Sequence, residues 1–151
     1  MRKPAGRFHL AIPVDDLERA VGFYAGLLGC AIGRRAETWV DFSFFGHQLS
    51  CHLAPGPREA EGRVDGRRVP VPHFGVILSR AAWEGLADRI RAAGHPFLAA
   101  PAVRYAGRAA EQGTFFVADP AGNALEFKYF ADERAIFAAF EEDATEEGRV
   151  S

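Results

Sequence analysis

The chain has 151 residues, of which 48% are hydrophobic, enough to build one compact domain or two small packed halves. Its 18 basic and 20 acidic side chains leave a net charge of −2, which disfavours nucleic acid or an anionic membrane as partner and favours a small molecule or another protein. The sequence has no long apolar run and no signal-peptide pattern, which predicts a soluble cytoplasmic protein in which Cys30 and Cys51 stay as thiols.

The first part of the chain, residues 7–54, predicts the element order βαβββ. Residues 7–13 place large apolar side chains at alternate positions, as a half-buried strand does. Asp15 or Asp16 then caps a helix with one apolar stripe, which Gly29 ends. Three more strands are predicted at residues 30–34, 38–45 and 48–54.

Residues 55–70 are rich in proline, glycine and charge and predict a surface linker. The order βαβββ then returns in residues 71–130, with a strand at 71–78 and a helix capped by Ser79 and closed by Gly94. Later strands are predicted at residues 97–100, 114–118 and 124–129. In the last segment, residues 131–151, a short helix is expected over 131–140 before a frayed tail. The predicted fold class is therefore α+β, with two βαβββ modules.

The two modules also repeat in sequence. The strand FHLAI and the later PHFGVI each carry a histidine at the second position, His9 and His73. The hairpin FFGHQLSC aligns with PAGNALEF, so that Ser50 corresponds to Glu126. Duplication of one ancestral module explains both matches.

The repeated positions predict a metal site. His9 shares its strand face with Ala11, and His73 shares its face with Gly75, so each histidine has a small neighbour. Two imidazoles and the carboxylate of Glu126 are a ligand set suited to Fe(II) with O₂ as a second reactant, although Mn(II), Ni(II) or Zn(II) would also fit. The alternative is that the histidines are ordinary half-buried strand residues and that the glutamate pairs with a nearby cation.

Other polar residues are candidates for supporting roles. Ser50, at the position that corresponds to Glu126, is a poor metal ligand and is expected to leave the fourth coordination position to water or substrate. His52 lies on the same strand face as Ser50 and is a candidate proton shuttle or replacement ligand. Arg104 and Tyr105, in the long loop before residue 114, are candidate substrate contacts, although a solvated loop has the same composition. The remaining histidines, His47 and His95, are expected on the surface.

Three stretches, FHLAIPVDDLERAVGFYAGLLG, PHFGVIL and FFVADPAGNALEFKYF, together resemble the vicinal oxygen chelate superfamily of glyoxalases, type I extradiol dioxygenases, thiol-transferring fosfomycin resistance proteins and bleomycin-binding proteins. The resemblance runs from about residue 8 to residue 130. It implies that the modules pair into a cupped, incomplete barrel around a divalent metal. By motif position, His9, His73 and Glu126 resemble the ligands of dioxygenase-like and fosfomycin-type members, whereas Ser50 departs from the four-ligand set of glyoxalases.

The resemblance implies an extradiol dioxygenase-like oxidoreductase that holds Fe(II) and acts with O₂ on a small vicinal-diol or aromatic substrate. In that hypothesis His52 moves a proton, with Tyr105 as a second candidate catalytic group, and Arg104 and Ser50 contact the substrate. The alternatives are a glyoxalase-like lyase or isomerase, a thiol transferase, and a drug-binding protein without turnover. A homodimer is expected, and the cup could be assembled within one chain or from modules of two chains.

Overall fold

The computed structural model describes residues 6–54, 63–64 and 67–138. The first module forms a four-stranded sheet in the order β1-β4-β3-β2, in which β1 and β4 are parallel and the other pairs are antiparallel. Asp16 caps the helical segment between β1 and β2, because its side chain accepts a hydrogen bond from the Arg19 N–H. The elements are β1 (His9–Val14), α1 (Leu17–Val21), η1 (Gly22–Leu27), β2 (Ala31–Arg35), β3 (Trp39–Phe44) and β4 (His47–Leu53).

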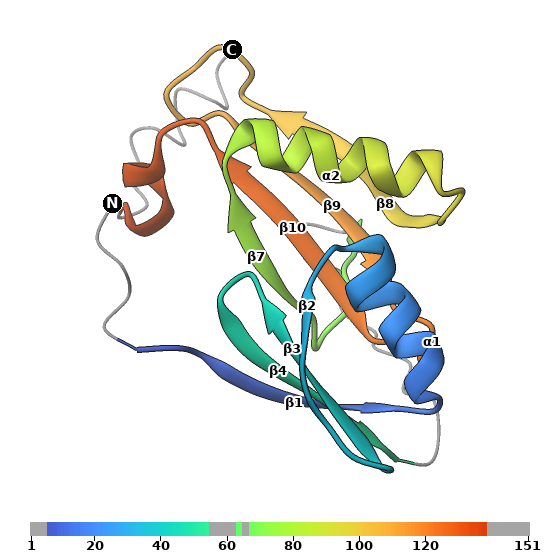
Figure 1. Cartoon of the computed structure of the whole chain (residues 1–151). Coiled ribbons are helices and arrows are strands. Elements are labelled where there is room, and N and C mark those ends of the chain that lie inside the picture. Colours follow the sequence, from blue (N-terminus) through green and yellow to red (C-terminus); the bar gives the residue numbers. More distant parts are fainter. Residues whose placement is uncertain (1–5, 55–62, 65–66, 139–151) are drawn as a thin grey trace.

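The second module repeats this topology in the order β7-β10-β9-β8. Ser79 caps its helix by accepting a hydrogen bond from the Ala82 N–H, as the sequence predicts. Both sheets are open at their outer edges and do not close into a barrel (Figure 1). The elements are β7 (Phe74–Leu78), α2 (Arg80–Ala92), β8 (Phe97–Arg104), β9 (Gln112–Ala118) and β10 (Ala124–Phe130), followed by the 3₁₀ helix η2 (Glu133–Phe137).

The strand registers agree with the sequence repeat. Ala11 pairs with Ser50 across β1 and β4, and Gly75 pairs with Glu126 across β7 and β10. Each of these pairs lies two residues beyond the histidine of its module. The correspondence that aligns Ser50 with Glu126 therefore holds in three dimensions.

The structure differs from the predicted elements in several places. The first helix widens into the π-helical η1, with a hydrogen bond from the Leu28 N–H to the Phe23 carbonyl. Strand β8 continues through Pro101 to Arg104, because β8 is an edge strand where the missing N–H of proline is tolerated. The predicted linker contains the short hairpin β5 (Arg63–Val64) and β6 (Arg67–Arg68), and its residues 55–62 and 65–66 lie outside the described part.

The C-terminal segment and two histidines differ as well. The predicted C-terminal helix is the 3₁₀ helix η2, and residues 139–151 lie outside the described part. His47 and His95, expected on the surface, are both half-buried. The His95 ring bonds the Ala118 carbonyl at 2.9 Å, and His47 accepts a hydrogen bond from the Phe8 N–H at 2.9 Å. No helix in the described ranges is long and apolar enough to cross a membrane.

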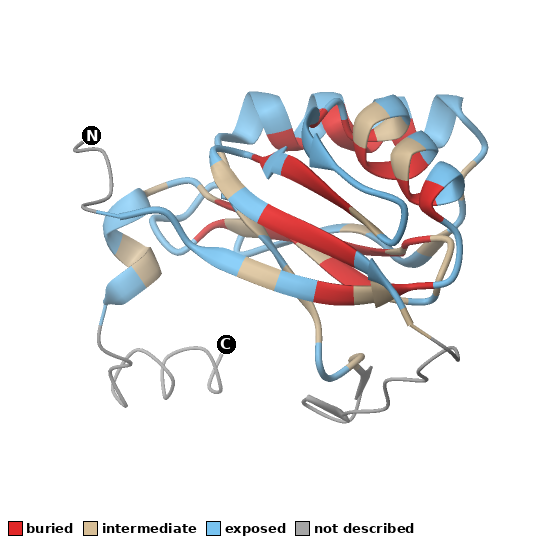
Figure 2. Ribbon diagram, turned by 60° about the horizontal axis from the view of Figure 1, so that its bottom comes forward, coloured by how far each residue is buried: buried red, intermediate tan, exposed pale blue. Residues whose placement is uncertain are grey.

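The core lies where the helices cover the sheets, as the buried residues in Figure 2 show. Trp83 of α2 donates its indole N–H to the Phe127 carbonyl of β10 at 2.9 Å, and its ring meets Tyr129 at a centroid distance of 4.9 Å. Gly113 makes room for this contact, because a Cβ at that position would overlap the Tyr129 ring. Helix α2 is thereby fixed on the inner face of the second sheet.

The two modules are joined by a buried polar contact between α1–η1 and the turn after β9. The Tyr24 hydroxyl donates to the Asp119 carboxylate at 2.7 Å, and Asp119 also accepts from the backbone and side chain of Asn123. The Asn123 amide donates in turn to the Pro13 carbonyl at 2.8 Å. We call these four residues, Tyr24, Asp119, Asn123 and Pro13, the module latch. Burial and the nearby Asp119 charge raise the pKa of Tyr24 well above its ordinary value, so this hydroxyl remains a donor at neutral pH.

Loss of the latch hydroxyl is expected to weaken the fold. Tyr24→Phe removes the donor but leaves the buried Asp119 carboxylate in place, which predicts a loss of about 1–3 kcal/mol in the free energy of unfolding. Urea denaturation of Tyr24→Phe checks this, with the exposed Tyr105→Phe as the matched control, expected within about 0.5 kcal/mol of wild type. Equal effects of both substitutions would contradict a latch.

A second buried carboxylate fixes the loop between β8 and β9. Glu111 accepts hydrogen bonds from the Gly107 N–H at 2.7 Å and the Tyr129 hydroxyl at 2.9 Å, and it pairs with Arg80 at 2.8 Å. The Gly107 N–H, the Tyr129 hydroxyl and the Arg80 charge together lower the pKa of Glu111 below its ordinary value of 4.5.

This lowered pKa predicts how stability depends on pH. The contribution of ionised Glu111 is fully present above pH 4.5 and is lost as the pH falls through the lower folded-state pKa. The difference in free energy of unfolding between wild type and Glu111→Gln is therefore expected to be largest near neutral pH and to shrink on acidification. Denaturant titrations between pH 7 and pH 3 measure it, with the exposed Glu37→Gln as control. A difference that is constant across this range would contradict the assignment.

Candidate metal and substrate site

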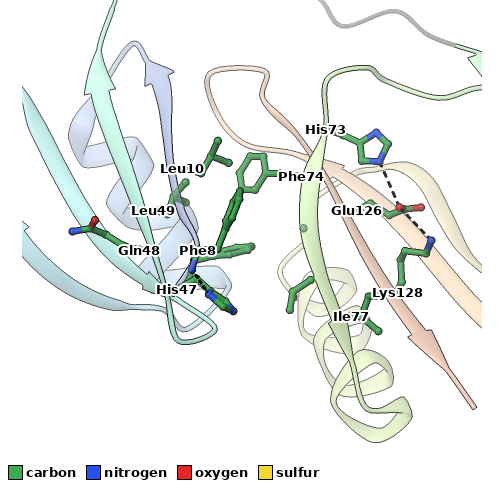
Figure 3. A pocket seen from close by; sticks show the side chains of 13 residues that line it. Phe8, Leu10, His47, Gln48, Leu49, His73, Phe74, Ile77, Glu126 and Lys128 are labelled. Atoms are coloured by element: carbon green, nitrogen blue, oxygen red, sulfur yellow. Dashed lines mark hydrogen bonds and ion pairs between the residues drawn. The ribbon is translucent and has the colours of Figure 1, made fainter. Parts of the chain in front are cut away.

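A hollow of about 470 Å³ lies between β1 and β4 of the first sheet and β7 and β10 of the second. Figure 3 shows that Phe74 points from β7 towards Phe8 and Leu10 of the first sheet. The side chains of His73 and Glu126 lie on the other side of β7. Strand β7 therefore separates an apolar part, which faces the first module, from a polar part on the outer face of the second sheet.

The polar part is centred on His73 and Glu126. The His73 Nε2 lies 3.5 Å from Glu126 Oε1, and both side chains are largely buried. The His73 Nδ1 lies 2.6 Å from the Pro70 carbonyl oxygen, which can only accept, so Nδ1 carries a proton. The Thr114 hydroxyl donates to Glu126 Oε2 at 2.7 Å, and the Lys128 ammonium lies 4.0 Å from Oε1.

These contacts make the pair suitable for a cation. With the proton on Nδ1, a neutral His73 turns the Nε2 lone pair towards a carboxylate oxygen, so two acceptors face each other. Two ligands about 2.0–2.2 Å from one ion, at angles of about 90–110°, are about 3–3.5 Å apart, which matches the observed separation. The Pro70 carbonyl and Thr114 contact these two side chains in the way that outer partners contact the ligands of metal sites. A proton on Nε2 would instead make this contact a simple ion pair.

Gly75 allows the two strands to approach each other at this site. It is the register partner of Glu126, and a Cβ at residue 75 would overlap the backbone carbonyl oxygen of that glutamate. Any larger residue would therefore push β7 away from β10 at the position that holds the carboxylate. The His73 ring also packs edge-on against Phe116 at a centroid distance of 5.1 Å.

The structure does not bring His9 to this pair. His9 is exposed and lies on the face of β1 opposite to Leu10, which lines the hollow towards the second module. Its register partner Gln48 points away from the second module in Figure 3. Among the described residues, no group of three His, Cys, Asp or Glu side chains lies close enough to hold one ion. Within one chain, the face that carries His9 and the face that carries His73 and Glu126 are turned in opposite directions.

The His9 face of the first sheet has its own polar cluster. Asp41 is buried and accepts hydrogen bonds from the Ser50 hydroxyl at 2.6 Å, from Gln48 at 3.3 Å and from Arg34 at 3.4 Å. Ser50, predicted at the substrate corner, is thus buried and donates its only proton to Asp41.

An aromatic side chain lies on the same face. The Arg34 guanidinium lies 5.5 Å from the centre of the Trp39 ring, and the exposed His52 ring lies on β4 at a centroid distance of 6.5 Å from Trp39. Arg34, Trp39 and Asp41 are not among the site residues that the sequence predicts. Alternation along β3, which places Trp39 and Asp41 on the face of Ser50, is the pattern that could have found two of them.

The other two candidates lie further away. Arg104 ends the edge strand β8 and pairs with Gln112, which pairs with Phe130 of β10. Arg104 therefore lies two strands away from β10. Along the strand direction it is level with Phe130, which is four residues, or about 13 Å, beyond Glu126. Tyr105 is exposed and has a positive φ of 55°. Neither residue lines the hollow between the sheets.

The two thiols take no part in this site. Burial raises the pKa of Cys30 to about 11, and burial with the nearby Asp119 and Asp41 charges raises the pKa of Cys51 to about 12. Both cysteines lie in the core, so at neutral pH neither is a thiolate nucleophile or ligand.

Comparison with solved structures identifies relatives of the whole fold. A glyoxalase/bleomycin resistance protein/dioxygenase from Alicyclobacillus acidocaldarius is 38% identical, with a TM-score of 0.73, over 91% of this chain and all of that one. The fosfomycin resistance protein FosX from Listeria monocytogenes is 14% identical, with a TM-score of 0.68, over 88% of this chain and 99% of its own. A lactoylglutathione lyase from Agrobacterium tumefaciens is 19% identical, with a TM-score of 0.59, over 85% of this chain and 96% of that one. The last two likenesses concern the fold alone.

A comparison with curated proteins found no match. The family model of the Glyoxalase/Bleomycin resistance protein/Dioxygenase superfamily matches residues 6–127, which cover the first module, the second module as far as Phe127, and the His73–Glu126 pair. With this match and the paired βαβββ sheets, the chain belongs to the Glyoxalase/Bleomycin resistance protein/Dioxygenase superfamily.

Proposed function

We propose that this protein is a metal-dependent enzyme of its superfamily, and that His73 and Glu126 are two of the metal ligands. The observation that carries the proposal is the orientation of this pair. In neutral His73 the Pro70 carbonyl holds the proton on Nδ1, and Thr114 donates to the carboxylate, so the Nε2 lone pair faces a negative charge at 3.5 Å.

The third ligand in this proposal is His9, supplied by a second copy of the chain. Because His9 and His73 lie on faces that are turned in opposite directions in one chain, two chains must meet for the three side chains to surround one ion. If the face of the first sheet that carries His9 packed against the face of the second sheet that carries His73 and Glu126 in another copy, both polar faces would also be covered. A homodimer is therefore part of the proposed active form.

The proposed reaction is extradiol dioxygenase-like oxidation of a small vicinal-diol substrate. A bound divalent metal, with Fe(II) preferred and Mn(II), Ni(II) or Zn(II) as alternatives, would act as a Lewis acid on the substrate oxygens. The Ser50 hydroxyl donates its proton to Asp41, so only its oxygen lone pairs are left for a ligand. Ser50 would therefore accept a hydrogen bond from a substrate hydroxyl. His52, two residues along the same face, is the proposed proton shuttle.

Arg104 and Tyr105 are proposed as contacts for the distal part of a substrate. Their place at the end of edge strand β8 suits a contact outside the ligand set. The positive φ of Tyr105 supports a role in binding, because such backbone strain is often found at functional sites.

Metal binding tests the ligand assignment. His73→Ala and Glu126→Gln are expected to weaken binding of Zn(II) or Fe(II) by at least about 100-fold, because each removes a ligand from a three-ligand site. Anaerobic titration calorimetry and metal analysis after gel filtration measure this, with the exposed Glu84→Gln as control. Stoichiometric metal in both ligand variants would overturn the site.

Activity assays on the same samples separate the reactions. Protein loaded anaerobically with Fe(II) is expected to consume O₂ with a panel of catechols, and both ligand variants are expected to lose this activity. Turnover of methylglyoxal with glutathione would instead support the lyase or isomerase alternative, and thiol opening of an epoxide the transferase. Ligand binding that survives chelator, without any turnover, would favour a drug-binding protein.

Mixed dimers test whether two chains share the site. A heterodimer of His9→Ala and His73→Ala chains, purified through two different tags, contains one intact ligand set if His9 comes from the partner. It is then expected to bind one metal ion per dimer, whereas each variant homodimer binds none tightly. If all three ligands came from one chain, the heterodimer would have no intact site and metal analysis would find none.

A further inference from the structure

A second hollow, of about 370 Å³, lies on the open face of the first sheet. It is separate from the His73–Glu126 pair, although Gln48 and His47 line both hollows. Gln48 is also the register partner of His9, so this second hollow begins one strand away from the proposed third ligand. The polar side chains that line it are Arg7, Arg34, Asp41, Ser43, His47 and Gln48.

Hydrogen-bond donors dominate this lining. Arg7 and Arg34 can only donate, and both carry a positive charge. His47 accepts the Phe8 N–H at Nδ1, so its neutral ring carries the proton on Nε2 and offers a donor there. Asp41 is the single carboxylate among the described lining residues, and it is buried, with one oxygen occupied by the Ser50 hydroxyl at 2.6 Å. A ligand that enters from solvent therefore meets mainly donors and positive charge.

Arg34 contacts Trp39 and Asp41 and still has free donors. Its side chain is 78% exposed, so most of its N–H groups face solvent. Its guanidinium lies near the Trp39 ring, and one nitrogen reaches Asp41 at 3.4 Å, a long contact that leaves the rest of the planar donor edge available. Such an edge matches the two oxygens of a carboxylate or phosphonate.

We propose that this hollow binds a terminal anionic oxygen group of a small ligand through Arg34 and Arg7. The proposal extends the proposed function, on which it depends for the link to the metal. Arg34 on β2 lies three strands away from His9 on β1, or about 14 Å at about 4.8 Å per strand. A substrate with its diol near His9 would therefore carry its acidic group at the far end of an extended molecule. The substrate class is then an extended acidic vicinal diol, and a dihydroxybenzoate serves as a short probe of the anion site alone.

Binding by metal-free protein tests this site independently of the ligand set. Chelator-treated wild type is titrated at low ionic strength with 3,4-dihydroxybenzoate, with its neutral analogue 3,4-dihydroxybenzamide and with phenylphosphonate. The carboxylate is expected to bind at least about tenfold more tightly than the amide, because only the anion makes charge-assisted hydrogen bonds. Titration calorimetry gives the ratio, and NMR shifts of Arg34, Ser43 and Gln48 amides locate the site.

Three variants complete the test. Arg34→Gln and Arg7→Gln are each expected to bring the ratio of carboxylate to amide affinity close to one. The control is Arg35→Gln, which removes a neighbouring cation that pairs with Glu18 instead, and it is expected to keep the wild-type ratio. Tighter binding of phenylphosphonate than of the carboxylate would assign the hollow to phosphonates, within the same anion chemistry.

Three results would overturn the proposal. They are equal affinity for the carboxylate and the amide, absence of binding by both anions, and equal effects of the Arg34 and Arg35 substitutions. None of them would affect metal binding by His73 and Glu126. Conversely, loss of the metal site would leave anion binding by metal-free protein unchanged, so the failures of the two proposals are distinguishable.

Discussion

The module latch determines how the whole molecule is arranged. Tyr24 from the first module and Asp119 and Asn123 from the second satisfy one another in the core, and Asn123 also reaches the Pro13 carbonyl. Because a buried carboxylate without donors is costly, these groups tolerate few relative positions of the two modules. Aromatic contacts between the modules, such as Phe44 with Phe74 at 5.6 Å, add apolar burial to the same arrangement.

This arrangement has a direct consequence for the polar faces. When the apolar side of each sheet packs towards the other module and the helices, strand alternation turns the opposite side outward. His9, Ser50 and Asp41 therefore lie on one outer face, and His73 and Glu126 on another. In the proposed dimer these two faces would be the two halves of one site, with the second half supplied by another copy of the chain.

The two proposed half-sites differ in chemistry, although they lie at corresponding positions of the repeat. The second sheet offers an imidazole nitrogen and a carboxylate, fixed by the Pro70 carbonyl and Thr114. In the first sheet, the position that corresponds to Glu126 is Ser50, whose proton is held by a buried aspartate, and arginines lie beside it. This divergence is consistent with a division of work in which one face holds a metal and the other recognises the substrate.

The sequence by itself determined the two βαβββ patterns, the capping residue Ser79 and a cap at Asp15 or Asp16, the repeat register and the proximity of His73 to Glu126. These features follow from the periodicity of apolar residues within each element and from the pairing of strands within one module, and both can be read from the sequence. Only the tertiary structure decided that His9 faces away from that pair, that Asp119 and Asn123 join the modules, and that Arg34 and Asp41 line a common hollow. The physical reason is that strand alternation defines two faces, whereas burial of side chains remote along the chain selects which faces meet.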